Sequence, residues 1–121
     1  MRQKVYFNNV GQGLFTEVYL GDDSGSEFRI VYDCGTSNRQ RVIQDAISAS
    51  TRRANNRPID LLVISHFDRD HISGVIDLIR SQQVRAVMLP KFSYILRVAF
   101  ASLKDNSELL NSDIREVLEN P

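Results

Sequence analysis

The 121-residue sequence lacks several features, and each absence excludes a class of protein. It has one cysteine, Cys34, so no disulfide can form within the chain, and a lone thiol is typical of a reducing compartment. No apolar run approaches the roughly 20 residues that a membrane-spanning helix needs. The apolar stretch that follows residues 1–4 is too short for a signal peptide. These absences predict a cytoplasmic protein without a membrane segment.

An excess of either charge is also absent. Lysine and arginine together number 15, aspartate and glutamate number 15, and the formal net charge is +0. A balanced chain has no general attraction to nucleic acid or to a membrane surface. The sequence has no internal repeat and no low-complexity segment, and its length suits one domain with a core.

Histidine is scarce, and the two histidines of the chain both fall within residues 65–74. His66, Asp68, Asp70 and His71 place metal-capable side chains close together in the sequence. Imidazole and carboxylate ligands suit zinc, manganese or iron, and the lack of thiolates argues against a closed structural zinc site. The alternative is a solvated loop whose aspartates favour a helix N-terminus. Two histidines that bracket two spaced aspartates favour the metal site.

The residues around this cluster predict where it lies in the fold. Residues 61–64 form a continuous apolar run, which predicts a strand buried on both faces. Ile72, Val75, Ile76 and Ile79 follow with the spacing of an amphipathic helix. The cluster should therefore end a strand and open a helix, where open α/β sheets bind their ligands. Its loop must curl, because ligands of one zinc lie within about 4.4 Å of each other.

Hydrophobic patterning predicts the other elements. Strands are expected at 5–10, 14–20, 28–32 and 84–89, and further helices at 92–103 and 107–119. Ser37 and Gln40 have the spacing of a capping box that opens another helix, with Ile43 and Ile47 in its apolar stripe. An early hairpin followed by alternating strands and helices predicts the α/β (α+β) class, with a mixed sheet and helices on one face.

Three ordered motifs resemble one family of enzymes. The pattern His-x-Asp-x-Asp-His at residues 66–71 resembles the metal motif of the metallo-β-lactamase fold hydrolases, His-x-His-x-Asp-His, with Asp68 at the second histidine position. Residues 10–13 (Val-Gly-Gln-Gly) and 32–35 (Tyr-Asp-Cys-Gly) lie upstream in the order of matching segments in one branch. That branch includes the metallo-hydrolase domain of DNA-uptake competence proteins and metallo-hydrolase components of phage-defence systems.

The resemblance implies a domain of two similar halves that form a four-layered αβ/βα sandwich. Residues 1–121 are enough for little more than one half. The chain is therefore expected to be the N-terminal portion of a single such domain, with the second half absent or supplied by a partner chain. The sheet face opposite the helices should then be apolar and uncovered, and the chain should self-associate through it.

The resemblance also implies roles for the cluster. His66 and Asp68 would serve one metal, Asp70 and His71 a second, and Asp70 would also orient the attacking hydroxide. Zinc is the expected metal, with manganese as a competitor because Asp68 makes the site harder and more negative. Asp33 is either a turn residue or a residue that hydrogen-bonds a ligand histidine.

Two functions from different classes follow. The first is a metal-dependent hydrolase that cleaves phosphodiesters in nucleic acid or a nucleotide, with two metals in a complete site. Since further ligands would come from the absent half, this chain alone is expected to be inactive. The second is a non-catalytic metal-binding or assembly module of a defence or DNA-uptake complex. Cys34 is expected to be a small buried residue, because no further histidine could activate it as a nucleophile.

Overall fold

The computed structural model describes residues 1–91. The chain divides into two compact units, Met1–Leu89 and Pro90–Pro121, and the elements described here belong to the first. The helices predicted at 92–103 and 107–119 lie outside the described residues. The elements are β1 (Arg2–Phe7), β2 (Gly13–Gly21), β3 (Glu27–Thr36), α1 (Gln40–Ala54), β4 (Leu61–Val63), α2 (Arg69–Ile72), α3 (Val75–Ser81) and β5 (Val87–Met88).

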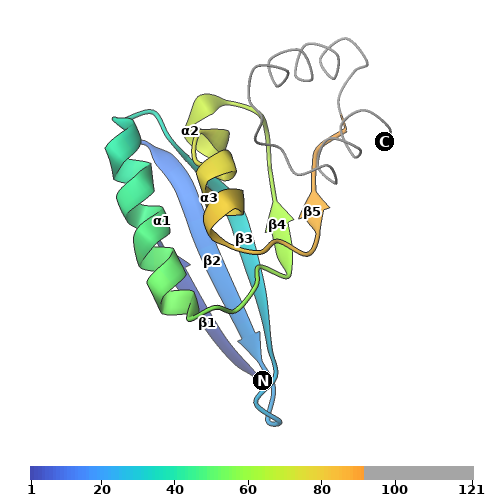
Figure 1. The fold of residues 1–121 in the computed structure, drawn as a ribbon. Coiled ribbons are helices and arrows are strands. Elements are labelled where there is room, and N and C mark those ends of the chain that lie inside the picture. Colours follow the sequence, from blue (N-terminus) through green and yellow to red (C-terminus); the bar gives the residue numbers. More distant parts are fainter. Residues whose placement is uncertain (92–121) are drawn as a thin grey trace. The chain divides into compact units, whose positions relative to one another are not determined.

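The strands form one mixed five-stranded sheet in the order β1-β2-β3-β4-β5 (Figure 1). β2 pairs antiparallel with both β1 and β3, whereas β4 pairs in parallel with β3 and β5 in parallel with β4. α1 connects β3 to β4, and α2 and α3 connect β4 to β5. All three helices lie on one face of the sheet (Figure 1). The predicted class, a mixed sheet with helices on one face, is confirmed.

The core lies between this face of the sheet and the helices. Strand alternation turns Phe15 of β2 and Val31 of β3 toward the helices, and both are buried. Ile43 and Ile47 of α1 and Leu78 of α3 cover them from the other side. No helix among residues 1–91 is long and apolar enough to cross a membrane.

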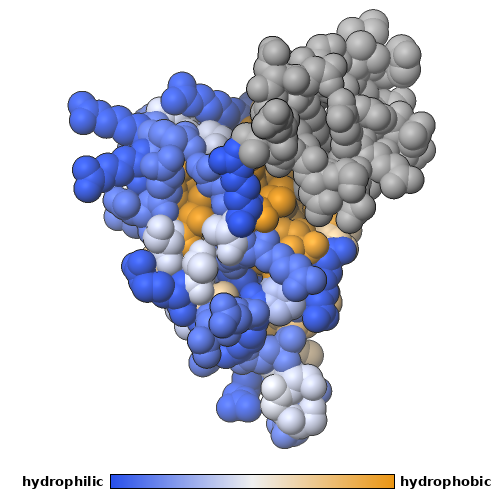
Figure 2. Space-filling model, in the orientation of Figure 1, coloured by the Kyte–Doolittle hydropathy of each residue, from blue (hydrophilic) through white to orange (hydrophobic). Residues whose placement is uncertain are grey.

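The opposite face of the sheet is apolar. The strand register places these side chains on it: Val5, Phe7, Val18, Leu20, Phe28, Ile30, Tyr32, Leu61, Val63 and Met88. Phe7 is 78% exposed, Met88 56% and Phe28 46%. By contrast, Figure 2 looks onto the helix-covered face, which is mostly hydrophilic with smaller apolar areas at its centre. The apolar sheet face expected from the sequence is therefore present.

Three predicted details of the strands are wrong. The strand expected at 5–10 lies three residues earlier, at Arg2–Phe7. β4 is not buried on both faces: Leu62 is buried, but Leu61 and Val63 lie on the apolar face and are only half-buried. The strand expected at 84–89 is shorter, because Val84 makes only an isolated bridge with Ile59 before β5 begins.

The predicted capping box at the start of α1 does not form. The N-cap is Arg39, which makes no side-chain cap. The Ser37 amide instead donates to the Gln12 carbonyl at 2.6 Å. The Gln40 side chain donates to the Ser73 carbonyl at 3.2 Å. Gln40 thus connects α1 to the junction between α2 and α3, a tertiary contact that local spacing could not predict.

The helix predicted after the histidine cluster is broken into α2 and α3 at residues 73–74. Gly74 packs directly on β3: its amide donates to the Cys34 carbonyl at 2.8 Å. A Cβ at this position would lie 2.9 Å from the Cys34 sulfur. The break rotates α3 relative to the predicted stripe, so that Leu78 is fully buried and Ile76 is 36% exposed.

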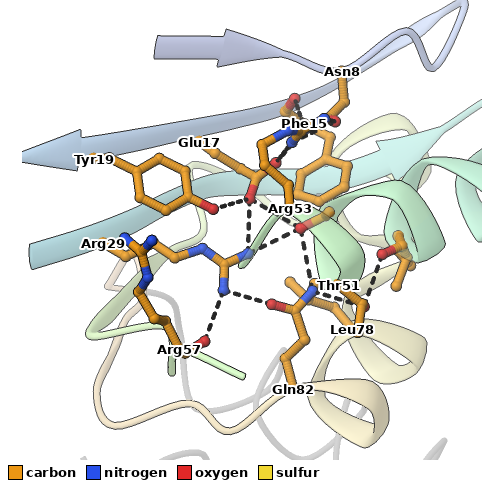
Figure 3. A network of polar contacts seen from close by, with 12 residues as sticks. Asn8, Phe15, Glu17, Tyr19, Arg29, Thr51, Arg53, Arg57, Leu78 and Gln82 are labelled. Atoms are coloured by element: carbon orange, nitrogen blue, oxygen red, sulfur yellow. Dashed lines mark hydrogen bonds and ion pairs between the residues drawn. The ribbon is translucent and has the colours of Figure 1, made fainter. Parts of the chain in front are cut away.

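A network of polar contacts lies inside the helix-covered core (Figure 3). Glu17 of β2 and Arg29 of β3 are buried and pair at 2.7 Å. Arg53 of α1 also pairs with Glu17, and the Ser50 hydroxyl donates to it at 2.9 Å. Arg29 further donates to the side chain of Gln82, just after α3. Because buried charges need partners, this network fixes two strands against α1 and the end of α3.

Candidate metal centre

The three motifs of the sequence meet at one end of the sheet. The Val10 carbonyl accepts a hydrogen bond from the Thr36 hydroxyl at 2.6 Å, which joins the first motif to the end of β3. A Cβ on Gly13 would lie 2.9 Å from the Asp70 carbonyl oxygen. A Cβ on Gly35 would lie 2.6 Å from the His71 amide nitrogen. The glycines therefore allow α2, which carries Asp70 and His71, to lie directly against β2 and β3.

A β-bulge sets the position of Asp33. Between the pairs Leu14↔Gly35 and Thr16↔Tyr32, β3 contains one more residue than β2. Asp33 lies in this bulge with φ 57° and is fully buried. A bulge commonly re-aims a side chain beside a functional site, and a non-glycine residue at positive φ is uncommon. The strained backbone turns the Asp33 carboxylate toward the loop after β4.

The loop after β4 holds the histidine cluster. The Ser65 amide donates to Asp33 Oδ1 at 2.7 Å, which fixes the start of the loop. Phe67 packs against the hydrophobic core and anchors its middle. The Asp68 carbonyl accepts from the His71 amide at 2.9 Å and opens α2. The loop is therefore curled, as chelation requires, and the side chains of His66 and Asp68 on either side of Phe67 reach the surface.

The structure brings all four predicted ligands together as two pairs. His66 Nε2 lies 3.3 Å from Asp68 Oδ2, and His71 Nε2 lies 3.3 Å from Asp70 Oδ2. The centroids of the two imidazole rings are 3.7 Å apart. The resemblance implies that each pair serves one metal, and this assignment stays a prediction, because ligand atoms of His66, Asp68 and Asp70 also gather within 4.8 Å of one another.

This donor set fits divalent metal ions. Two ligands of a tetrahedral zinc, each about 2.1 Å from the metal, lie about 3.4 Å apart, and each pair has its atoms at 3.3 Å. Ligand atoms of His66, Asp68 and Asp70 also lie within 4.8 Å of one another. The Asp68 side chain is 77% exposed and that of Asp70 39%, so the site opens to solvent.

Asp33 and Ser65 contact the far side of both histidines. His71 Nδ1 lies 2.7 Å from Asp33 Oδ2, and His66 Nδ1 lies 2.8 Å from the Ser65 hydroxyl. That hydroxyl donates to Asp33 Oδ2. Although Asp33 lies close enough to both histidines to share a metal with them, its oxygens accept hydrogen bonds from Ser65. This arrangement suits a residue that holds the histidines rather than one that binds the metal.

Ser65 was missed in the sequence, although a signal was present. A hydroxyl residue there stands between the apolar run at 61–64 and the first histidine. Cys34, by contrast, is fully buried as expected. Burial, followed by the charges of Glu17, Asp77 and Asp33, raises the pKa of the Cys34 thiol well above its ordinary value. A thiol in this state is a poor nucleophile.

Comparison with known proteins agrees with this geometry. The family model of the metallo-beta-lactamase superfamily matches residues 12–104, which include the cluster and most of the sheet. No curated protein matches the sequence. The matched residues make up more than half of the chain. The chain belongs to the metallo-beta-lactamase superfamily.

Proposed function

We propose that this chain is the metal-binding part of a hydrolase that cleaves phosphodiesters in nucleic acid or a nucleotide. Membership of the superfamily indicates a metal-dependent hydrolase. The observation that carries the proposal is the two histidine–carboxylate contacts, both at 3.3 Å, at the end of the sheet. The Nε2 atoms of the two histidines face the carboxylates of Asp68 and Asp70, while their Nδ1 atoms face Ser65 and Asp33.

The protein's own residues would hold and orient the reacting groups. His66 and Asp68 would hold one divalent ion, and Asp70 and His71 a second; zinc is proposed, with manganese as competitor. Such ions supply charge that stabilises the transition state and lowers the pKa of water. Asp70 is the better placed of the two aspartates to accept the proton of the attacking water, because it is less exposed than Asp68.

The phosphodiester substrate is supported by the order of the three motifs. Residues 10–13, 32–35 and 65–74 resemble segments of the competence and phage-defence branch, and in the structure they lie against each other. Lactams and thioesters are the less favoured substrates. A cytoplasmic location is part of the same proposal and is supported by the single cysteine.

The remaining metal ligands would come from outside residues 1–91. Each pair offers two ligands, whereas a catalytic zinc has three protein ligands. The chain has two histidines and both are already used. The apolar sheet face supports a second layer, from a further portion of the same protein or from a partner chain. This chain alone should therefore bind metal weakly and show little hydrolysis.

Metal binding is tested by zinc and manganese titration of the metal-free chain. A His66→Ala, His71→Ala double variant should bind less metal than the wild type, and Asp45→Asn should bind as the wild type does. Asp45 is a suitable control because it is an exposed carboxylate on α1, outside the histidine cluster, and pairs with Arg41 at 3.9 Å. Equal binding by all three proteins would exclude the histidines as ligands in this chain.

Hydrolysis is tested on the chain combined with the further portion or partner chain that this proposal invokes. The wild type should turn over a chromogenic phosphodiester, and Asp70→Asn should lose this activity because an amide cannot accept the proton. Asp68→His restores the commoner motif and should retain metal binding. Equal rates for the wild type and Asp70→Asn would exclude the role of Asp70.

The second candidate function is a non-catalytic metal-binding or assembly module. The observation that favours it is the openness of the site, since Asp68 is 77% exposed and each proposed metal would receive two ligands from the described residues. Metal binding without turnover of any phosphodiester by the complete protein would select this function over the hydrolase.

A further inference from the structure

The two histidines are held from behind by one buried carboxylate. Asp33 Oδ2 contacts His71 Nδ1 directly at 2.7 Å. It contacts His66 through the Ser65 hydroxyl, which lies 2.8 Å from His66 Nδ1. The other oxygen of Asp33 accepts the Ser65 amide at 2.7 Å. Ser65 is therefore fixed by two hydrogen bonds to the same carboxylate.

Counting protons gives the tautomer of each histidine. An ionised carboxylate only accepts hydrogen bonds, so His71 Nδ1 must carry the proton that it shares with Asp33. A serine hydroxyl has one hydrogen, and in this geometry it is donated to Asp33. The Ser65 oxygen can then only accept from His66, which requires a proton on His66 Nδ1. Both histidines therefore have a free lone pair on Nε2.

We propose that Ser65 is a positioning residue. Its hydroxyl links the Asp33 carboxylate to His66 by hydrogen bonds and fixes that histidine in its Nδ1–H tautomer. The inference concerns the metal-free chain and holds whether or not the hydrolase proposal is correct. One buried carboxylate then determines the tautomer of both imidazoles, that of His71 by direct contact and that of His66 through one hydroxyl. A metal that approaches from solvent meets two Nε2 lone pairs and needs no proton transfer at either ring.

Competing contacts on the solvent side do not reverse this assignment. Nε2 of each ring lies 3.3 Å from an aspartate oxygen, a longer contact than those at Nδ1. Asp68 and Asp70 are partly or largely exposed, so water can satisfy their oxygens. Asp33 is fully buried and cannot be satisfied by bulk water, so losing its donors costs more.

The backbone conformation of Asp33 supports the proposed role of its contacts. Asp33 has φ 57° within a β-bulge, a conformation that costs free energy for a residue with a side chain. Such strain persists where surrounding contacts over-determine the position. Here the contacts are those of Asp33 with Ser65 and His71. Asp33 lies in β3, whereas Ser65 follows β4 and His71 lies in α2.

The test is ¹⁵N NMR of the metal-free chain with labelled histidine, at about pH 9, where an ordinary imidazole is neutral. In the wild type, both histidines should show a protonated Nδ1 and an unprotonated Nε2. An Nε2–H tautomer at His66 in the wild type would overturn the proposal without the need for any variant.

The variants separate Ser65 from general structure. Ser65→Ala should convert His66 to a mixture of tautomers while His71 keeps its Nδ1 proton. Ser65→Thr retains the hydroxyl and should restore the wild-type signals. Asp33→Asn should change both histidines. Ser73→Ala is the matched control, because its hydroxyl donates to the Thr36 carbonyl and not to a histidine. A folded Ser65→Ala variant with unchanged His66 signals would overturn the proposal.

Discussion

Burial of Glu17 disfavours its charge and by itself would raise the pKa of its carboxyl. Hydrogen bonds from Asn8, Arg29 and Ser50, together with the charge of Arg29, outweigh this effect. The pKa of Glu17 is therefore lowered. A carboxyl with a lowered pKa in the folded state stabilises the protein above its unfolded pKa, about 4.3. The contribution is lost as the pH falls through the folded pKa. Acid should therefore weaken the polar network in the core.

Replacing Glu17 by Gln should lower the free energy of unfolding by about 3–5 kcal/mol at neutral pH, because Arg29 would remain buried without a full counter-charge. The variant should also lose part of the decline in stability that the wild type shows below about pH 4. Urea denaturation between about pH 3 and 7 measures both effects. Asp45→Asn, on the exposed face of α1, is the control and should behave as the wild type. An undiminished acid dependence in Glu17→Gln would contradict this account.

Single residues also show where sequence reasoning stops. The types and spacing of His66, Asp68, Asp70 and His71 were enough to predict a cluster, because all four lie within residues 66–71. The contact of Ser65 with Asp33 joins residues 32 positions apart, and it depends on a bulge that no local pattern predicts. For the same reason, the partners of Glu17 could not be predicted.

At the scale of elements, close packing between β3 and α2 positions His71. Gly35→Ala would place a Cβ 2.6 Å from backbone atoms of His71 and Ile72, which cannot yield as a flexible side chain can. We expect α2 to shift and the free energy of unfolding to fall by about 1–3 kcal/mol, as for other overpacked sites. Metal affinity should fall as well, because the His71 imidazole would move with α2 away from Asp33 of β3, which it contacts at 2.7 Å.

Gly21→Ala is the matched control for this change. It lies in β2, and an added Cβ would meet no atom closer than 3.6 Å, which is an ordinary contact. Thermal unfolding and zinc titration of both variants would check the prediction. Similar losses in both would mean that a general cost of removing a strand glycine, and not the contact with α2, is responsible.

The strand faces were predicted better than the helix ends for a physical reason. Strand alternation depends on which face is buried, so residues 14–20 and 28–32 could be assigned to faces from the sequence. Helix ends depend on what packs against them. Gln40 turns to the Ser73 carbonyl, and Gly74 donates to β3, so the capping box and the continuous stripe through Ile76 were both wrong.

At the scale of the whole molecule, most of the exposed large apolar side chains among residues 1–91 lie on the apolar sheet face. Its exposed members include Phe7, Phe28 and Met88. We expect the isolated chain to self-associate through it and to bind a dye that reports apolar surface. A Phe28→Thr, Met88→Thr variant should bind less dye and scatter less light at the same concentration.

Ile76→Thr is the control for this experiment. Ile76 is 36% exposed but lies on α3, on the helix-covered side. Its replacement should leave association unchanged. A wild-type chain that remains a monomer at high concentration and binds no dye would show that this face is covered, and would weaken the proposal that a second layer is supplied from elsewhere.

The location of Cys34 gives the molecule a built-in chemical reporter. The thiol lies between Asp33, which holds the histidines, and Gly35, on which α2 rests, and it is inaccessible in the folded state. A disulfide reagent can therefore modify it only when the segment around Gly74, which packs on the sulfur, moves away from β3. The rate of modification then measures how often the packing on β3 beneath the metal centre opens. A metal that binds only the closed form should slow this rate by the factor 1 + [metal]/Kd, so the affinity can be determined from a thiol reaction in a protein with a single thiol.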